Sequence, residues 1–331
     1  MSQVMWSAIF DRHGGAEVLE YRQVARPDAG PGEILVRVHY CALNALDYFV
    51  RRGVPGIEVK LPHISGGDVV GRVEQSGDQV GHDLVGRLVL LDPLVDGQAL
   101  GESRPGGLAE YVVAPAANAI LLDEATEHPE YFAALPIAYG TAHRMLHARG
   151  RLGRGETVVV LGAAGGVGVA CVQLALLAGA RVIATSSSPV KLARIAELGA
   201  VETIDTSIDD FSSRVWTLTG KVGADLVIDY IGRATLARSI RATRHGGRIV
   251  TCGASSGSEA LIDLRYLWVR EVDLLGSDGW RRSDLESLCR LVVAGDLVPI
   301  IDSTFPLSRV AEAMAAVEER RAFGKVVVRL E

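Results

Sequence analysis

The sequence predicts an α/β protein built from two domains, one a doubly wound parallel sheet and the other rich in β-strands. Its 331 residues exceed what one ordinary hydrophobic core accommodates. Residues 1–125 carry short strand patterns separated by glycine and proline, whereas from about residue 130 apolar strand and helix patterns alternate. Such alternation is typical of a parallel sheet with helices on both faces.

In the first part of the chain, four strands and one helix are expected. The strands are predicted at 34–40, 68–74, 84–91 and 108–114, because each is rich in apolar residues and bounded by glycine or proline. In this part of the chain, a helical pattern of sufficient length to predict a helix covers residues 44–52. This spacing predicts a small barrel-like or sandwich-like β domain.

The second part opens with an apolar helix pattern from 130 to 149 that is interrupted at Pro136 and Gly140. After it, strands are predicted at 157–161, 181–185, 225–229, 248–252 and 272–276, with helices at 167–178, 189–198 and 236–243. Two further helices are expected at 286–294 and 310–320, and a closing strand at 324–330.

The composition excludes several classes of protein. The net charge is −6 and no basic cluster reaches five residues, so binding to nucleic acid or to an anionic membrane is not expected. Apolar stretches are broken before the ~18 residues of a membrane helix, and the first dozen positions lack a signal-peptide core. The four cysteines show no metal or redox spacing. We expect a cytoplasmic protein that acts on a small molecule.

The most informative motif follows the strand expected at 157–161 and opens the next helix. It ends in Ala164, Gly165, Gly166, Val167 and Gly168. Glycines let the backbone approach a pyrophosphate, and the helix N-terminus supplies unpaired N–H groups and partial positive charge. The G-x-G-x-x-G pattern is imperfect, because its first position is Ala163. A tight turn without ligand is the alternative, but the βα units that follow favour a dinucleotide on a Rossmann domain.

The end of the second strand of this domain indicates which dinucleotide is bound. Sites that prefer NAD place an Asp or Glu here, about 20 residues beyond the glycines, to hold the ribose 2′-hydroxyl. The present strand ends without an acid, and Ser186, Ser187 and Lys191 can receive a 2′-phosphate. We therefore expect NADP(H), with a polar loop and a solvated lysine as the alternative. Ile231 and Gly253, which follow two later strands, are further candidates for cofactor contact.

Several segments, taken in order, resemble the medium-chain dehydrogenase/reductase family, in its zinc-free branch of quinone oxidoreductases and enoyl reductases. They are Pro31-Gly32-Glu33, Asn44-Ala45-Leu46-Asp47, Gly66-Gly67-Asp68-Val69-Val70-Gly71, Gly107-Leu108-Ala109-Glu110-Tyr111, the glycine motif and Gly324-Lys325-Val326-Val327-Val328. The resemblance implies a GroES-like catalytic domain from residues 1–127 and 280–331, with the Rossmann domain at 128–279 inserted into it. It also implies an active site in the cleft and a homodimer paired through the strand at 272–276.

The departures from this family concern metal and the proton donor. Zinc-dependent members place a cysteine at Asn44, a histidine at Gly67 and a cysteine or similar ligand near Ile137, and they carry a four-cysteine lobe that 92–104 lacks. Glycine and isoleucine cannot coordinate zinc, so no metal is expected. A site without a Lewis acid favours reduction of a quinone or of a conjugated C=C bond over oxidation of an alcohol. Many enoyl reductases have a tyrosine where this chain has Pro55, which leaves the proton donor open.

Three residues are the candidates for catalysis. Asn44 is expected to donate a hydrogen bond to a substrate carbonyl or to hold the nicotinamide ribose, with a helix N-cap as the alternative. The resemblance places Thr141 against the nicotinamide and offers Tyr139 as an acid. The expected activity is NADPH-dependent hydride transfer to a quinone or an α,β-unsaturated carbonyl. An enoyl-thioester reductase and a non-catalytic NADPH-binding protein are the alternatives.

Overall fold

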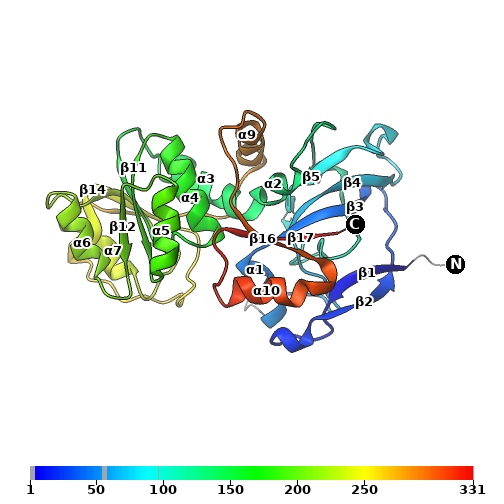
Figure 1. Cartoon of the computed structure of the whole chain (residues 1–331), viewed down its shortest axis with the longest axis horizontal. Helices are drawn as coiled ribbons and strands as arrows, with labels where there is room; N and C mark the ends of the chain where they lie inside the picture. Colours follow the sequence, from blue (N-terminus) through cyan, green and yellow to red (C-terminus); the bar gives the residue numbers. More distant parts are fainter. Residues whose placement is uncertain (1–3, 54–57, 96, 331) are drawn as a thin grey trace. The chain divides into compact units, whose positions relative to one another are not determined.

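The structure is a computed structural model that describes residues 4–53, 58–95 and 97–330 (Figure 1). The chain forms two compact units. The first consists of Met1–Ile137, Leu285–Val293 and Val298–Glu331, and the second of Ala138–Asp284 and Ala294–Leu297. The domain boundaries expected at 127/128 and 279/280 lie close to the ends of these units without coinciding with them, and they stay predictions.

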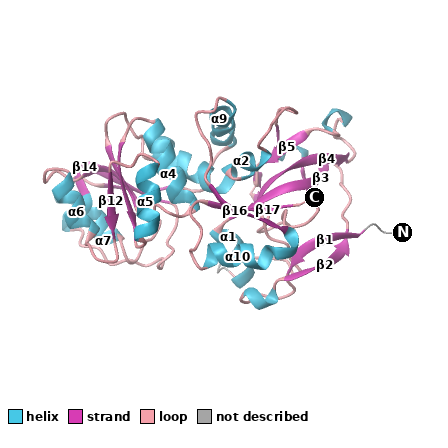
Figure 2. Ribbon diagram, in the orientation of Figure 1, coloured by secondary structure: helices cyan, strands magenta, loops and turns pink. Residues whose placement is uncertain are grey.

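The first unit is organised around a sheet of seven strands, counted over the described residues. The strands are β3 (Glu33–Leu43), β4 (Asp68–Ser76), β5 (Leu88–Leu91), β8 (Tyr111–Pro115), β9 (Ala119–Leu121), β16 (Ile301–Pro306) and β17 (Lys325–Arg329). Their spatial order is β16, β17, β3, β4, β5 and β9, with β8 paired to the first half of β3. Strands from the end of the chain therefore complete a sheet that begins near residue 33 (Figure 2).

Smaller elements accompany this sheet. They are the hairpin of β1 (Val4–Ile9) and β2 (Glu20–Ala25), the pair β6 (Leu94–Val95) and β7 (Gln98–Ala99), and the helices α1 (Ala45–Arg52), α2 (Pro129–Ala133) and α10 (Val310–Glu318). The core forms because alternate residues of β3, including Ile34 and Val36, point to one face and pack with Met314 of α10. Helix α1 begins at the end of β3, and Asn44 occupies its N-cap position.

The second unit contains a sheet of six parallel strands, again counted in the part of the chain that the structure describes. The strands are β10 (Thr157–Val160), β11 (Arg181–Ser186), β12 (Glu202–Asp205), β13 (Ala224–Ile228), β14 (Thr243–Thr251) and β15 (Asp273–Gly276). Their spatial order, β12-β11-β10-β13-β14-β15, is the Rossmann order 3-2-1-4-5-6. The order reverses between β10 and β13, and dinucleotides bind at the carboxyl ends of strands at such a point.

Helices flank this parallel sheet. They are α3 (Thr141–His143), α4 (Gly166–Leu177), α5 (Pro189–Glu197), α6 (Phe211–Leu218), α7 (Leu236–Ala242) and α8 (Arg265–Arg270), and α9 (Arg282–Val293) contains residues of both units. Because helices cover the sheet, the three valines that end β10 are fully buried, as a short continuous apolar run predicts. Among the described residues, none of the helices combines the length and hydrophobicity needed to cross a bilayer.

The expected fold class is confirmed, and the differences have local causes. The strand expected at 84–91 is shorter, because His82–Leu84 form a 3-10 turn before β5. The expected interruptions at Pro136 and Gly140 do not break the helix, which instead widens into π-helical segments at Leu135–Gly140 and Arg144–Arg149. Strands β1, β2, β6, β7, β9, β12 and β16 and helices α6 and α8 were not expected, and β6, β7 and β9 are only two or three residues long.

Candidate active site

The predicted dinucleotide loop lies at the carboxyl end of β10 and leads directly into α4. No side chain caps the helix at Gly165, and the first intrahelical hydrogen bond runs from Val169 N–H to Gly165 O at 2.8 Å. A Cβ atom added at Gly165 meets one protein atom within 4 Å, Gly162 O at 3.9 Å, so the space beside the helix N-terminus is open. Backbone N–H groups beside open space are what a pyrophosphate requires.

The other glycines of the loop serve its packing. A Cβ at Gly168 would lie 2.4 Å from Gly162 O and 2.7 Å from the hydroxyl of Tyr230, so only glycine fits there. Tyr230 donates its hydroxyl to Gly162 O at 2.9 Å, and Thr185 O accepts the N–H of Ala163 at 2.8 Å. Gly162 has a φ of 61°, which favours glycine. The loop is therefore braced by β11 and by Tyr230, which follows β13.

The residues predicted to hold a 2′-phosphate lie together where β11 meets α5. Ser186 ends the strand, and its Oγ accepts the N–H of Ser188 at 3.2 Å. Ser188 is the N-cap of α5, with its Oγ 3.5 Å from Lys191 N. Lys191 is partly exposed. Of the two predicted serines, Ser186 is buried and Ser187 is exposed.

One carboxylate lies close to this group of serines. Asp205 of β12 is the register partner of Ser186 in β11. Its Oδ1 accepts hydrogen bonds from the backbone N–H and the hydroxyl of Ser207, at 2.9 and 2.6 Å, and these bonds lower the pKa of Asp205. A negative charge in this position opposes a bound phosphate, whereas Lys191 favours it.

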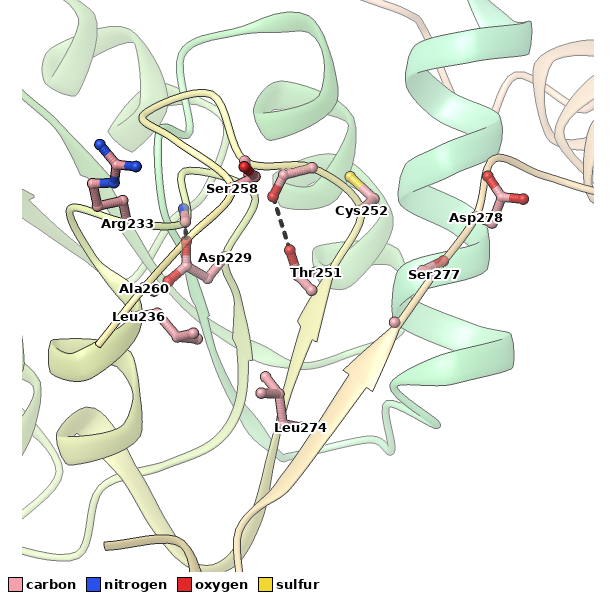
Figure 3. Close-up of a pocket in the computed structure, with 14 residues that line it drawn as sticks. Asp229, Arg233, Leu236, Thr251, Cys252, Ser258, Ala260, Leu274, Ser277 and Asp278 are labelled. Atoms are coloured by element: carbon pink, nitrogen blue, oxygen red, sulfur yellow. Dashed lines mark hydrogen bonds between the residues drawn. The ribbon is translucent and has the colours of Figure 1, made fainter. Parts of the chain in front are cut away.

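A cavity of about 500 Å³ lies at the carboxyl ends of β13, β14 and β15 (Figure 3). Gly253, a predicted cofactor contact, lines it beside Thr251 and Cys252. Ser277 and Asp278, which follow β15, supply polar groups at one side. Burial raises the pKa of the Cys252 thiol to about 12, so it stays protonated near neutral pH.

Ile231 borders the same region. Its N–H is bound by Asp229 Oδ1 at 3.0 Å, and Asp229 lines the cavity. The strand ends that carry the predicted contacts Ile231 and Gly253 are therefore adjacent to the cavity, at the edge of the sheet where the glycine loop also lies.

Tyr139 and Thr141 precede the Rossmann sheet. The ring of Tyr139 is fully buried and its hydroxyl donates to Gln173 Oε1 at 2.6 Å. A phenol committed to Gln173 does not favour the role of proton donor. Thr141 is also buried, at 7% exposure, at the start of α3.

In the first unit, Asn44 belongs to a cluster of charged groups that the sequence did not predict. Its Nδ2 donates to Asp68 Oδ2 at 2.8 Å, and its Oδ1 accepts from Lys325 Nζ at 2.6 Å. Lys325 and Asp68 form an ion pair of 2.9 Å and are both buried, at 1% and 0% side-chain exposure. Asn44 itself is partly exposed. The amide therefore lies over a buried ion pair.

A second carboxylate supports the backbone of this cluster. Asp47 accepts hydrogen bonds from the N–H groups of Asn44 and Gly66, at 2.7 and 2.9 Å. Burial raises the pKa of Asp47 to about 7, and the charge of Asp68 adds to the shift, whereas the two N–H donors oppose it. Burial likewise raises the pKa of the nearby Cys41 thiol well above its usual value.

The three positions at which zinc ligands are expected in relatives meet around Asp68. Ile137 N–H donates to Asp68 Oδ1 at 2.9 Å, and Asn44 binds the other oxygen. A Cβ at Gly67 would lie 3.0 Å from Ile137 Cδ1, so the isoleucine fills the space beside this glycine. These side chains offer no set of ligands that fits zinc. Over the described residues, no group of three His, Cys, Asp or Glu side chains is arranged to hold a metal ion.

Sequence reasoning missed Lys325, Asp68 and Tyr230 as parts of the site. The available signal was a charge in an apolar strand, since Lys325 precedes three valines and Asp68 precedes two. Such charges are buried only when they are paired. Pro55, the position that bears on the proton donor, lies outside the described residues.

Comparisons with known proteins agree with this architecture. Residues 30–124 match the model of the alcohol dehydrogenase GroES-like domain, and residues 166–294 match that of the zinc-binding dehydrogenase. The crystal structure of an NAD-dependent alcohol dehydrogenase is 38% identical, covers 99% of this chain and 100% of its own, and has a TM-score of 0.92. The chain belongs to the medium-chain dehydrogenase/reductase family.

Two curated members of the family show the chemistry found among its relatives. The quinone oxidoreductase of Homo sapiens is 28% identical over 307 residues, which cover 91% of this chain and 90% of the relative. The acryloyl-coenzyme A reductase of Sulfurisphaera tokodaii is 26% identical, over 96% of this chain and 98% of the relative. This medium-chain dehydrogenase/reductase is therefore an oxidoreductase, in the branch of quinone and enoyl reductases, with a fold that binds nicotinamide cofactors.

Proposed function

We propose that the protein is a zinc-independent, NADPH-dependent reductase of quinones or α,β-unsaturated carbonyl compounds. The observation that carries this proposal is the gathering of Asn44, Gly67 and Ile137 around the Asp68–Lys325 ion pair. Where zinc-dependent relatives are expected to hold a metal, this chain has an amide and an apolar side chain. Substrates whose own conjugation spreads negative charge fit such a site better than alcohols do.

The chemistry assigns a role to each part of the chain. A bound NADPH supplies the hydride. The loop at Ala164, Gly165, Gly166, Val167 and Gly168 would hold its pyrophosphate, and the Asn44 amide would donate to the substrate carbonyl. Hydride addition to the β-carbon would shift the C=C electron pair into a new bond between the α-carbon and the carbonyl carbon, and the carbonyl π pair would move onto oxygen. Asn44 stabilises that oxyanion, and a proton from solvent completes the product.

The cofactor preference rests on the serines and Lys191. Ser186 and Ser187 offer hydroxyls to a 2′-phosphate, and Lys191 offers a positive charge. Two facts oppose this preference: Asp205 lies opposite Ser186, and one similar structure is an NAD-dependent enzyme. Fluorescence titration of the wild type and of Lys191→Ala with NADPH and NADH tests it. NADPH should bind more tightly, and Lys191→Ala should narrow the gap by roughly 1–3 kcal/mol. Tighter binding of NADH to the wild type would contradict the proposal.

Zinc independence is tested directly by elemental analysis of the purified protein. We expect less than stoichiometric zinc, and turnover that survives dialysis against a chelator. About one zinc per chain, removed together with activity, would contradict this part of the proposal, since the second family model is that of zinc-binding dehydrogenases.

An enoyl-thioester reductase is the second candidate function. The similarity to acryloyl-coenzyme A reductase favours it. Comparison of kcat/KM for free quinones, free enones and acyl-thioesters separates the two activities. A preference of at least tenfold for thioesters would replace the first proposal with the second. A protein that binds NADPH but oxidises it with none of these compounds would be a binding protein.

The test of the catalytic site is single-turnover hydride transfer at saturating NADPH. Asn44→Ala should slow quinone or enone reduction at least about tenfold, since loss of one oxyanion donor costs ~10²–10³ and a polarised substrate needs less help. NADPH affinity should change little. Asn118→Ala is the matched control, because Asn118 is a buried asparagine of the same unit that binds Asp92 O. Equal rates in Asn44→Ala and wild type would assign Asn44 to the helix cap alone.

We also propose that the protein works as a homodimer in the cytoplasm. Strand β15 is at the edge of its sheet, and Leu274 on it is 42% exposed. Leu261, Trp268 and Val269 nearby in the sequence are more exposed still. An open edge strand beside apolar side chains favours pairing with a second copy. Light scattering at micromolar concentration should report a dimer, and a monomer would contradict this proposal.

A further inference from the structure

The buried cluster of the first unit is built around one partly exposed amide. Asp47, Asp68 and Lys325 are all buried, and Asn44 binds each of them. Asp47 holds the backbone N–H of Asn44, whereas Asp68 and Lys325 hold the two ends of its side chain. Asn44 is the member of the cluster that reaches the surface of the unit.

The chemistry of these partners determines the orientation of the Asn44 carboxamide. The two ends of a carboxamide are nearly the same size, but the oxygen only accepts hydrogen bonds and the nitrogen only donates them. Lys325 can only donate and an ionised Asp68 can only accept. A rotation of 180° would place the oxygen against the Asp68 carboxylate and the NH₂ group against the Lys325 ammonium. The ion pair therefore permits one orientation.

We infer that Lys325 and Asp68 are positioning residues that keep the N–H side of the Asn44 amide, rather than its carbonyl oxygen, available to the substrate oxyanion. This inference rests on the proposed function of Asn44. One Nδ2 hydrogen is bound by Asp68 at 2.8 Å, while the other Nδ2 contact, to Ala42 O, is long at 3.4 Å. A long hydrogen bond is readily exchanged for a better acceptor.

Stability alone does not explain this ion pair. Replacement of a buried ion pair by uncharged groups of similar volume is often neutral or stabilising, because two charges must be desolvated to form the pair. The unit contains another internal pair, Arg51 with Glu318 at 2.8 Å, that joins α1 to α10 and has no contact with the Asn44 side chain. It provides a comparison in which the ion pair lies away from the amide.

The test is a double variant that removes both charges and leaves the shape. In Asp68→Asn/Lys325→Met, the introduced amide can accept from Ile137 N–H with its oxygen and donate from its nitrogen, which favours the turned orientation of Asn44. We expect hydride transfer at saturating NADPH to slow about tenfold, as for Asn44→Ala. NADPH affinity should be unchanged. The single variant Lys325→Arg, which retains the donor and the charge, should transfer hydride at most of the wild-type rate.

A double-mutant cycle separates positioning from a general loss of stability. In the Asn44→Ala background, Asp68→Asn/Lys325→Met should cause no further slowing, because the pair would act through Asn44. The matched control, Arg51→Met/Glu318→Gln, removes the other pair and should leave the rate unchanged. A folded Asp68→Asn/Lys325→Met variant with the wild-type rate would overturn the inference, as would a loss that adds fully to that of Asn44→Ala.

A measurement without turnover distinguishes failure of this inference from failure of the proposed function. If the wild type reduces no quinone or enone, the proposed function fails. The Nδ2 protons of Asn44, assigned by their absence in Asn44→Ala, can still be followed by NMR. They should exchange slowly in the wild type and faster in Asp68→Asn/Lys325→Met. Identical exchange in both would overturn the inference.

Discussion

The two units of this molecule assemble their candidate sites in opposite ways. In the first unit the site consists of charged and polar side chains from the N-cap of α1, from β4 and from β17, and each side chain is bound to another member of the cluster. In the second unit it consists of backbone groups and glycines from one short loop, and one side of that loop is open. In the first arrangement the buried charges are paired without a ligand. The second is arranged for an anion that completes it.

This contrast predicts different responses to mutation. Removing one of the two buried charges of the first site leaves the other charge unpaired, so the cost should fall on folding. When an atom is added to the second site and enters the open space, the cost should fall on ligand binding.

The largest effect is expected when only the cation of the first site is removed. Lys325→Met leaves the Asp68 carboxylate buried and unpaired, which should lower the free energy of unfolding by about 3–5 kcal/mol. Asp68→Asn/Lys325→Met should lose much less, because no charge remains buried. Urea denaturation of both variants measures the difference. If the single variant is as stable as the double variant, Asp68 in Lys325→Met does not behave as an uncompensated buried charge.

The next effect separates two glycines of the dinucleotide loop. Gly168→Ala brings a Cβ to 2.4 Å from Gly162 O, so the loop must shift, and NADPH affinity should fall about 100-fold. Gly165→Ala adds a Cβ in open space and should leave the thermal stability unchanged while it weakens NADPH about tenfold. Fluorescence titration and thermal denaturation measure both quantities. Equal losses of stability would mean that the space at Gly165 is not open.

A pH dependence should distinguish the first site from the second. Asp47 has a pKa of about 7 in the folded chain and about 3.9 when unfolded, so its protonated form stabilises the fold. This stabilisation is complete below the unfolded pKa and is lost as the pH rises through about 7. Between about pH 5.5 and 7.5 the wild type should lose about 2 kcal/mol more than Asp47→Asn. If the free energies of unfolding of the wild type and of Asp47→Asn change in parallel with pH, Asp47 does not titrate in this range.

The smallest effect concerns the brace behind the dinucleotide loop. Tyr230→Phe removes the donor to Gly162 O and should weaken NADPH binding by about 1 kcal/mol. Tyr266→Phe is the matched control, because Tyr266 is an exposed tyrosine of the same unit and should bind NADPH like the wild type. Equal affinities of the two variants would show that the loop keeps its shape without the brace.

The same contrast explains how much the sequence revealed. The glycine loop was predictable because its residues are consecutive and its strand and helix context is local. Asn44 was predicted through resemblance, but its partners were not, since Asp68 is 24 residues away and Lys325 is 281 residues away. Only folding brings such residues together. The direction of a side chain is equally hidden: the resemblance offered Tyr139 as an acid, and the sequence does not reveal that its hydroxyl donates to Gln173.

The position of Lys325 also has a consequence for the time at which the cluster around Asn44 can form. A ribosome makes the chain from its N-terminus, and domains fold as units while synthesis proceeds. The Rossmann sheet is encoded between the two parts of the first sheet, so it can fold before β17 has been made. Until Lys325 emerges, Asp68 has no cation and the orientation of Asn44 is not fixed. A nascent chain can therefore acquire its cofactor-binding unit first and its oriented amide only when β17 is made.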